Sequence, residues 1–145
     1  MEPTATGAAR EAAVRPSVEA DRVAAAAVEP IESVVDLAHL ARMTLGEASL
    51  EAEVLRLFEQ QAAVLLARMQ DATPTAAAAF AHTLKGSARG IGAWGVAAAA
   101  EAVETNAERA SASATACAVA RLAAAVEAVK AGIAQRLRRL AEGEE

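Results

Sequence analysis

Large apolar side chains recur every three or four residues along much of this chain, which is the spacing of amphipathic helices. The clearest run predicts a last helix over about 114–140, with the spacing of a coiled-coil seam. An earlier run predicts a long helix that ends near Asp71, after a short helix over about 34–42. The apolar positions of the last helix are Val119, Leu122, Val126, Val129, Ile133, Leu137 and Leu140; those of the earlier one are Leu50, Val54, Leu57 or Phe58, Gln61 or Ala62, Leu65 and Met69.

Two more helices are predicted between these runs. Thr73 followed by Pro74 supplies a polar N-cap and a proline at the first helical position, so a helix begins there. It ends or bends at 90–92, and the helical pattern resumes over about 94–109. The residues of this helix expected to face the core are Phe80, Leu84, Ala88 and Ile91. Four long helices with short loops predict an all-α fold, an antiparallel up-down four-helix bundle with a short N-terminal lead-in helix.

Composition agrees with one small helical domain. The chain is 54% hydrophobic but only 2% aromatic, so its core consists mainly of Leu, Val, Ile and Ala, which suits closely approaching helices. The bundle is predicted over residues 30–141, with a disordered C-terminal tail over 142–145. Residues 1–29 lack a sustained large-apolar pattern and are expected to be a flexible tail. The alternative is an alanine-rich helix over 18–28 that packs on the bundle or on a partner.

Charge and cysteine content exclude several classes of function. The chain has 14 basic and 19 acidic residues, and the basic ones are dispersed except near 136–139, so nucleic-acid binding is not expected. A single cysteine, Cys117, can form neither an internal disulfide nor a zinc cluster, and a small buried side chain is expected there. The uncharged stretches look too short and alanine-rich for a membrane span, and the N-terminus does not resemble a signal peptide. A cytoplasmic protein is therefore expected.

The segment Ala81-His82-Thr83-Leu84-Lys85-Gly86-Ser87-Ala88 carries the candidate chemistry. On a helix, Lys85 lies about 60° and Gly86 about 40° around the axis from His82, and Arg89 lies about 20° away. Leu84 is about 200° away, so the core stripe and the histidine occupy different faces. The sequence therefore predicts an exposed histidine beside two basic side chains.

Small residues border this histidine. Ala78 and Ala79, one turn earlier, are too small to cover the imidazole. Gly86 costs about 1 kcal/mol relative to alanine within a helix, so local stability does not explain it. An open position there would let a second macromolecule bring its backbone close to His82. Lys85 and Arg89 disfavour the imidazolium and attract anions such as phosphoryl oxygens, and a neutral imidazole is a nucleophile.

The motif His82-Thr83-Leu84-Lys85-Gly86-Ser87-Ala88, followed by Ile91-Gly92-Ala93, resembles the signature of histidine-containing phosphotransfer (HPt) domains of multistep phosphorelays. The segments 36–40 and 53–61 resemble the lead-in helix and the first long helix of such domains, so the resemblance covers roughly 30–141. The turn with Arg89 and Gly90 departs from the pattern, because many relatives have a small or polar residue and an asparagine there.

The resemblance implies that His82 accepts a phosphoryl group, that Lys85 supports it and that Gly86 clears the docking surface, with Ala78, Ala79 and Arg89 around it. It implies as partners the receiver domains of a hybrid histidine kinase and of a response regulator, in reversible transfer at Nε2. Mg²⁺ is expected on the receiver and no cofactor on this chain, since no carboxylate cluster is expected to face His82. The chain lacks a Gly-rich phosphate loop, so it is not expected to phosphorylate itself from ATP.

Two other functions stay open from the sequence. One is a dimeric phosphotransferase related to histidine-kinase dimerisation domains, although those usually have an acidic residue after the histidine, where this chain has Thr83. The other is a helical adaptor that binds receivers without transferring phosphate. A monomer is expected. His39 is interpreted as a partly exposed residue of the lead-in helix, Gly92 as a turn residue, and Trp94 as an apolar cap or an exposed contact.

Overall fold

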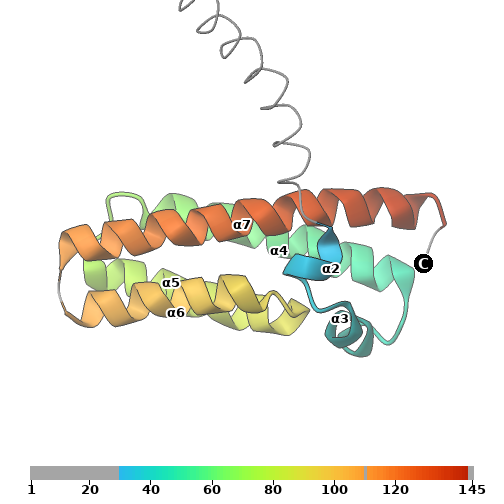
Figure 1. Ribbon diagram of the computed structural model, residues 1–145, viewed down its shortest axis with the longest axis horizontal. Coiled ribbons are helices and arrows are strands. Elements are labelled where there is room, and N and C mark those ends of the chain that lie inside the picture. Colours follow the sequence, from blue (N-terminus) through green and yellow to red (C-terminus); the bar gives the residue numbers. More distant parts are fainter. Residues whose placement is uncertain (1–29, 110, 144–145) are drawn as a thin grey trace, which may run out of the picture.

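The computed structural model describes residues 30–109 and 111–143, and all of its regular elements in these ranges are helices (Figure 1). The all-α prediction is confirmed. The predicted N-terminal tail lies outside the described residues, as do the last two positions of the predicted C-terminal tail. The helices are α2 (Ile31–Val34), α3 (Leu37–Met43), α4 (Ala48–Met69), α5 (Pro74–Ile91), α6 (Trp94–Glu108) and α7 (Ala112–Ala141).

The helix boundaries follow local chemistry that the sequence displays. Thr73 caps α5 by accepting a hydrogen bond from the N–H of Ala76 at 3.1 Å, and Pro74 stands in the first turn, as predicted. The predicted lead-in helix over 34–42 is present as α3, but it begins later than predicted because the chain is extended at Val35, and the short helix α2 precedes it. Asp36 begins the second of these helices by accepting from the N–H of His39 at 3.1 Å.

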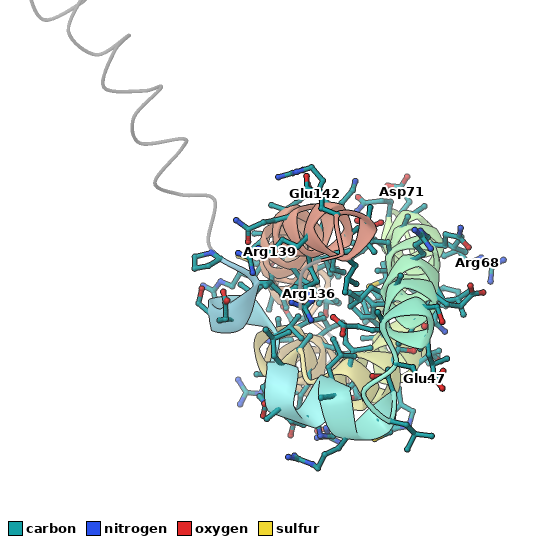
Figure 2. All side chains as sticks on the ribbon, turned by 90° about the vertical axis from the view of Figure 1, so that its right-hand side faces the viewer. Glu47, Arg68, Asp71, Arg136, Arg139 and Glu142 are labelled. Atoms are coloured by element: carbon teal, nitrogen blue, oxygen red, sulfur yellow. The ribbon has the colours of Figure 1, made fainter. Side chains whose placement is uncertain are left out.

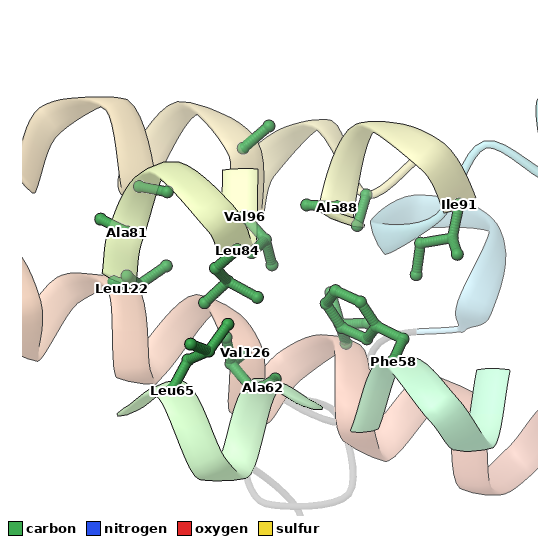
Figure 3. Packing of buried hydrophobic residues seen from close by; sticks show 14 of the residues in the cluster. Phe58, Ala62, Leu65, Ala81, Leu84, Ala88, Ile91, Val96, Leu122 and Val126 are labelled. Carbon is green, nitrogen blue, oxygen red and sulfur yellow. The ribbon is translucent and has the colours of Figure 1, made fainter. Parts of the chain in front are cut away.

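The four long helices pack in contact with one another. α5 contacts both α4 and α6, and α7 contacts both α6 and α4, while α2 lies on α7 and α3 on α5. In the core, Leu84 and Ile91 of α5 face Phe58 and Leu65 of α4 (Figure 3). The α5–α6 contact is the most extensive, and the two helices carry several buried alanines: Ala77, Ala81, Ala88, Ala97 and Ala100.

The core stripe of α4 agrees in part with the predicted one. Of the predicted alternatives, Phe58 and not Leu57 fills the core: Phe58 is 4% exposed and Leu57 is 54% exposed. In the first half of the helix, Leu50 is 37% exposed, and Leu55 is buried in place of the predicted Val54. Leu50 and Leu57 therefore lie on the exposed surface of α4.

One ion pair is buried between α4 and α7. Arg136 donates from Nε to Glu51 at 2.5 Å and from a terminal nitrogen to the other carboxylate oxygen at 3.2 Å. Both side chains are almost fully buried, and in the end-on view of Figure 2 Arg136 lies inside the ring of helices. Such a pair is costly to break, because the partner left behind is a buried, uncompensated charge.

Two features of α7 add to the sequence analysis. Cys117 was expected to be buried but is exposed, since the core positions of this turn are taken by Ala118 and Val119. Within the described residues, α7 is the one helix long and apolar enough to cross a membrane by length and composition alone. The support for a membrane span is weak, because a core helix of a soluble protein has the same length and composition, and α7 packs on α4 and α6.

The two phenylalanines should differ in their contribution to stability. Phe58 is buried, whereas Phe80, which was expected in the core stripe, is half-buried and packs against the edge of the core. Phe58→Ala should lower the free energy of unfolding by about 3–5 kcal/mol, and Phe80→Ala by about 1–2 kcal/mol. Urea titrations followed by circular dichroism measure both, and equal losses would contradict this assignment of the core.

Candidate functional site

His82 lies on the solvent face of α5, opposite the core. Ala81, Leu84 and Ala88 turn inward and are fully buried, whereas the side chain of His82 is 71% exposed. The predicted separation of core and histidine is therefore confirmed. Ala79 is exposed and Ala78 is half-buried one turn earlier, and neither side chain is large enough to cover the imidazole.

A carboxylate from α6 contacts this histidine. Glu104 places Oε2 2.8 Å from Nδ1 of His82 and Oε1 2.6 Å from Nζ of Lys85. No carboxylate cluster was expected to face His82, and this single carboxylate was not anticipated. Among residues 30–109 and 111–143, no three His, Cys, Asp or Glu side chains gather as they would around a metal ion.

Sequence reasoning missed Glu104 because it lies on another helix. A signal was present, since His82 and Glu104 are equally distant in sequence from Ala93, in the turn between α5 and α6. Helices that fold back from a tight turn bring such mirrored positions to similar heights. The count alone does not specify which side chains meet, because this also depends on the rotation of each helix about its axis.

The charge state of Glu104 follows from its contacts. Burial raises the pKa of its carboxyl, but hydrogen bonds from Lys85 and His82, together with their charges, outweigh burial and hold the pKa below its usual value. Glu104 is therefore a carboxylate at neutral pH, and a carboxylate only accepts hydrogen bonds. Nδ1 of His82 must then donate, and a neutral ring carries its lone pair on Nε2.

The two basic residues near His82 have different settings. Lys85 is only 14% exposed and its ammonium pairs with Glu104. Arg89 is 55% exposed and lies 3.7 Å from Glu101 of α6, a loose surface pair. Both cations therefore lie along the α5–α6 edge of the site, and only Lys85 is held closely.

Two glycines leave the other edge of the site bare. A Cβ atom added at Gly86 or at Gly90 would meet no heavy atom within 4 Å. The two positions are four residues apart and lie on one side of α5, so they form a strip free of side chains. This glycine strip begins beside His82 and runs toward α4.

The glycine strip leads into an apolar groove between α3, α4 and α5. The groove has a volume of about 500 Å³, and its exposed wall includes Met43 and Leu57, which are 57% and 54% exposed. Ser87 donates a hydrogen bond to Gln61 across it. Sequence reasoning missed the groove because it did not decide between Leu57 and Phe58 as the core position of α4. Its lining residues are Met43, Thr44, Val54, Leu57, Phe58, Gln61, Ser87, Gly90 and Ile91.

Comparison with known proteins identifies the family. A family model described as the Hpt domain matches residues 53–132, which is more than half of the chain and includes α5 and α6 entirely. The chain belongs to the Hpt domain family. Hpt domains carry out histidine phosphotransfer in phosphorelays and interact with receiver domains. No curated protein and no solved structure matches the chain.

A cluster of contacts fastens α3 of the Hpt domain to the α5–α6 turn. Asp36 accepts from the indole Nε1 of Trp94 at 3.2 Å, and its own N–H donates to the carbonyl of Gly92 at 2.9 Å. Hydrogen bonds from the backbone of His39 and from Trp94 lower the pKa of Asp36. His39, half-buried as predicted, meets the ring of Trp94 edge-on at 5.0 Å. Trp94 is thus both a cap on this end and 46% exposed.

Gly92 and Gly86 should respond oppositely to alanine. Gly92 has φ +83°, and a Cβ there would lie 3.0 Å from Asp36, so Gly92→Ala should destabilise the Hpt domain by about 1–3 kcal/mol. Gly86→Ala adds a methyl group in open space within a helix and should stabilise it by about 0.5–1 kcal/mol. Thermal unfolding measures both effects. A destabilised Gly86→Ala would show that this glycine has a packing role.

Proposed function

We propose that this protein is a phosphorelay intermediate in which Nε2 of His82 reversibly accepts a phosphoryl group from the aspartyl phosphate of one receiver domain and passes it to another. The observation that carries the proposal is the exposed His82, within the family-matched segment, with Nδ1 bonded to a carboxylate. This arrangement leaves the opposite ring nitrogen as the nucleophile.

The transfer step is a displacement at phosphorus. The lone pair of Nε2 forms the N–P bond as the P–O bond to the receiver aspartate breaks, and the bonding electrons stay on the aspartate oxygen. Catalysis of this kind is largely positioning and charge stabilisation. In the proposal Lys85 supports the negative phosphoryl oxygens electrostatically, Mg²⁺ is supplied by the receiver, and this chain contributes no cofactor.

The docking surface in this proposal comprises the apolar groove, the glycine strip, Ala78, Ala79 and Arg89. We propose that its occupant is an apolar helix face of the receiver domain. Supporting this choice, the groove is continuous with the glycine strip through Gly90, so one rigid partner can fill the groove and still reach His82. Exposed leucine and methionine side chains favour a partner surface of the same character.

We further propose that α4, α5, α6 and α7 form an antiparallel up-down bundle, over the predicted domain 30–141, and that the protein acts as a cytoplasmic monomer. The contacts of α5 with α4 and α6, and of α7 with α6 and α4, support this order around the bundle. A monomer by light scattering would also set aside the dimeric kinase-like alternative.

Loss of the imidazole should abolish phosphorylation without unfolding. His82→Gln removes the nucleophile from an exposed position, so the circular-dichroism spectrum should not change while phosphate incorporation falls to zero. The label, provided by a phosphorylated receiver or a small phosphoramidate, is followed by intact mass and ³¹P NMR; it should be acid-labile and base-stable. His39→Gln, the control at the other histidine, should still accept one phosphate. If His82→Gln is labelled like wild type, the proposal fails.

Changes in the groove should weaken receiver binding while leaving His82 reactive. Leu57→Glu puts a charge on the groove wall, and Gly86→Glu puts bulk and charge on the glycine strip, so receiver affinity should fall about tenfold or more. The matched control is Val64→Glu, because Val64 is 48% exposed on the same helix but does not line the groove. Isothermal titration measures affinity, and phosphorylation by a small phosphoramidate checks His82. Equal effects at Leu57 and Val64 would argue against the groove.

A further inference from the structure

Three exposed apolar side chains on α4 are only partly explained by the apolar groove. Leu50, Leu57 and Val64 are 37%, 54% and 48% exposed, and of the three only Leu57 lines the groove. They are seven residues apart, so each lies within about 20° of the next around the helix axis. Together they form a line about 21 Å long, the α4 stripe. Apolar residues at seven-residue spacing are typical of a helix face that packs along a second helix.

We propose that the α4 stripe pairs with the α4 stripe of a second copy of this chain, antiparallel to it, with a two-fold axis at Leu57. The stripe is symmetric about its middle, because Leu50 precedes Leu57 by as many residues as Val64 follows it. In the antiparallel pair, Leu57 therefore meets Leu57, and Leu50 of each copy meets Val64 of the other. One surface serves both copies, as a two-fold interface requires.

The charges at the two ends of the stripe are complementary in this pair. Glu47 comes ten residues before Leu57 and Arg68 eleven after it, so Glu47 of one copy lies at about the height of Arg68 of the other. Both side chains are exposed, and Figure 2 shows Arg68 projecting outward from α4. Within the part of the chain that the structure describes, neither has an ion-pair partner. The two-fold axis would form this ion pair twice.

The order of these residues favours the antiparallel pair over other partners. A parallel pair would place Glu47 beside Glu47 and Arg68 beside Arg68, and like charges repel. In the antiparallel pair, Glu53, the acidic residue beside the middle of the stripe, comes near Gln60 of the second copy, whose amide can donate a hydrogen bond. A partner of another sequence would require none of this symmetry, so the symmetry favours a second copy.

The pair should be weak and reversible. Stable protein interfaces bury about 1,200–2,000 Å² in total, the apolar residues of the stripe supply much less, and exposed ion pairs add little. The protein should therefore be monomeric when dilute and paired as its concentration rises. Because Leu57 also lies in the groove wall, pairing would cover part of the receiver-docking surface, and receivers would bind the monomer. This competition rests on the proposed function, whereas the pairing does not.

Sedimentation velocity of the full chain over a range of concentrations measures the pairing, and charge reversals test its register. Glu47→Arg and Arg68→Glu should each weaken self-association about tenfold, because each places like charges opposite one another at both ends of the pair. An equimolar mixture of these two variants should associate like wild type, since every Arg at these positions then faces a Glu. Glu47 makes no side-chain cap hydrogen bond, so the fold should survive both changes, which circular dichroism checks.

A charge on the stripe itself should have a stronger effect. Val64→Glu puts a carboxylate against Leu50 of the second copy, outside the apolar groove, and should abolish pairing. The matched control is Ala63→Glu, which adds the same charge at the adjacent exposed position, about 120° around the axis from Leu57, and should pair like wild type. The inference is overturned if wild type stays monomeric up to about 1 mM, if Val64→Glu pairs as well as Ala63→Glu, or if the mixed charge variants do not associate.

A receiver domain separates this result from the proposed function. At concentrations where wild type is paired, Val64→Glu should bind the receiver with higher apparent affinity than wild type, because no second copy has to leave first. A protein that pairs as described but binds no receiver would uphold the pairing and contradict the proposed function instead.

Discussion

The close approach of α5 and α6 is the constraint on which the site depends. Both helices carry fully buried alanines, such as Ala81 and Ala100, and their contact is the most extensive between any two helices of the described residues. Only Gly92 and Ala93 join the two helices, so the short connection restricts how far one helix can shift along the other. Because the backbones are close, a glutamate on α6 reaches both His82 and Lys85. A leucine in place of one of these buried alanines would displace its neighbours and disturb the contacts of Glu104 with His82 and Lys85.

The exposed side of α5 has an open surface at two positions where a different residue would give a more stable helix. Two of its positions are glycine although an alanine would fit without a contact, and a residue of high helix propensity would strengthen the helix. Local rules of helix design are broken here, on the side of α5 that carries His82, while the buried side of the same helix obeys them. Stability comes instead from the core contacts of Leu84 and Ile91 with α4.

Features set by neighbours in sequence could be predicted, and features set by rotation of one helix against another could not. Thr73 and Pro74 fixed the start of α5 through local hydrogen bonding and backbone geometry, and the position of His82 opposite Leu84 followed from the helical period. The pairing of His82 with Glu104 depends on the register of two helices. The inward choice between Leu57 and Phe58 depends on a small rotation of α4, which apolar spacing leaves undetermined because both neighbours are apolar. The break at Val35 was missed because a four-residue helix carries almost no periodic signal.

The buried pair of Glu51 and Arg136 has a consequence for where the folding unit ends. Both residues lie outside the segment that the Hpt family model matches, one before it and one after it. Nearby, Gly132 leaves room for α2, whose Ile31 backbone would lie 3.1 Å from an added Cβ. The residues just before the matched segment therefore contact the C-terminal half of α7. The family model ends before Arg136, whereas the packing contacts of this chain continue beyond it, and a slip of α4 by one turn along α7 would leave two unpaired charges in the interior.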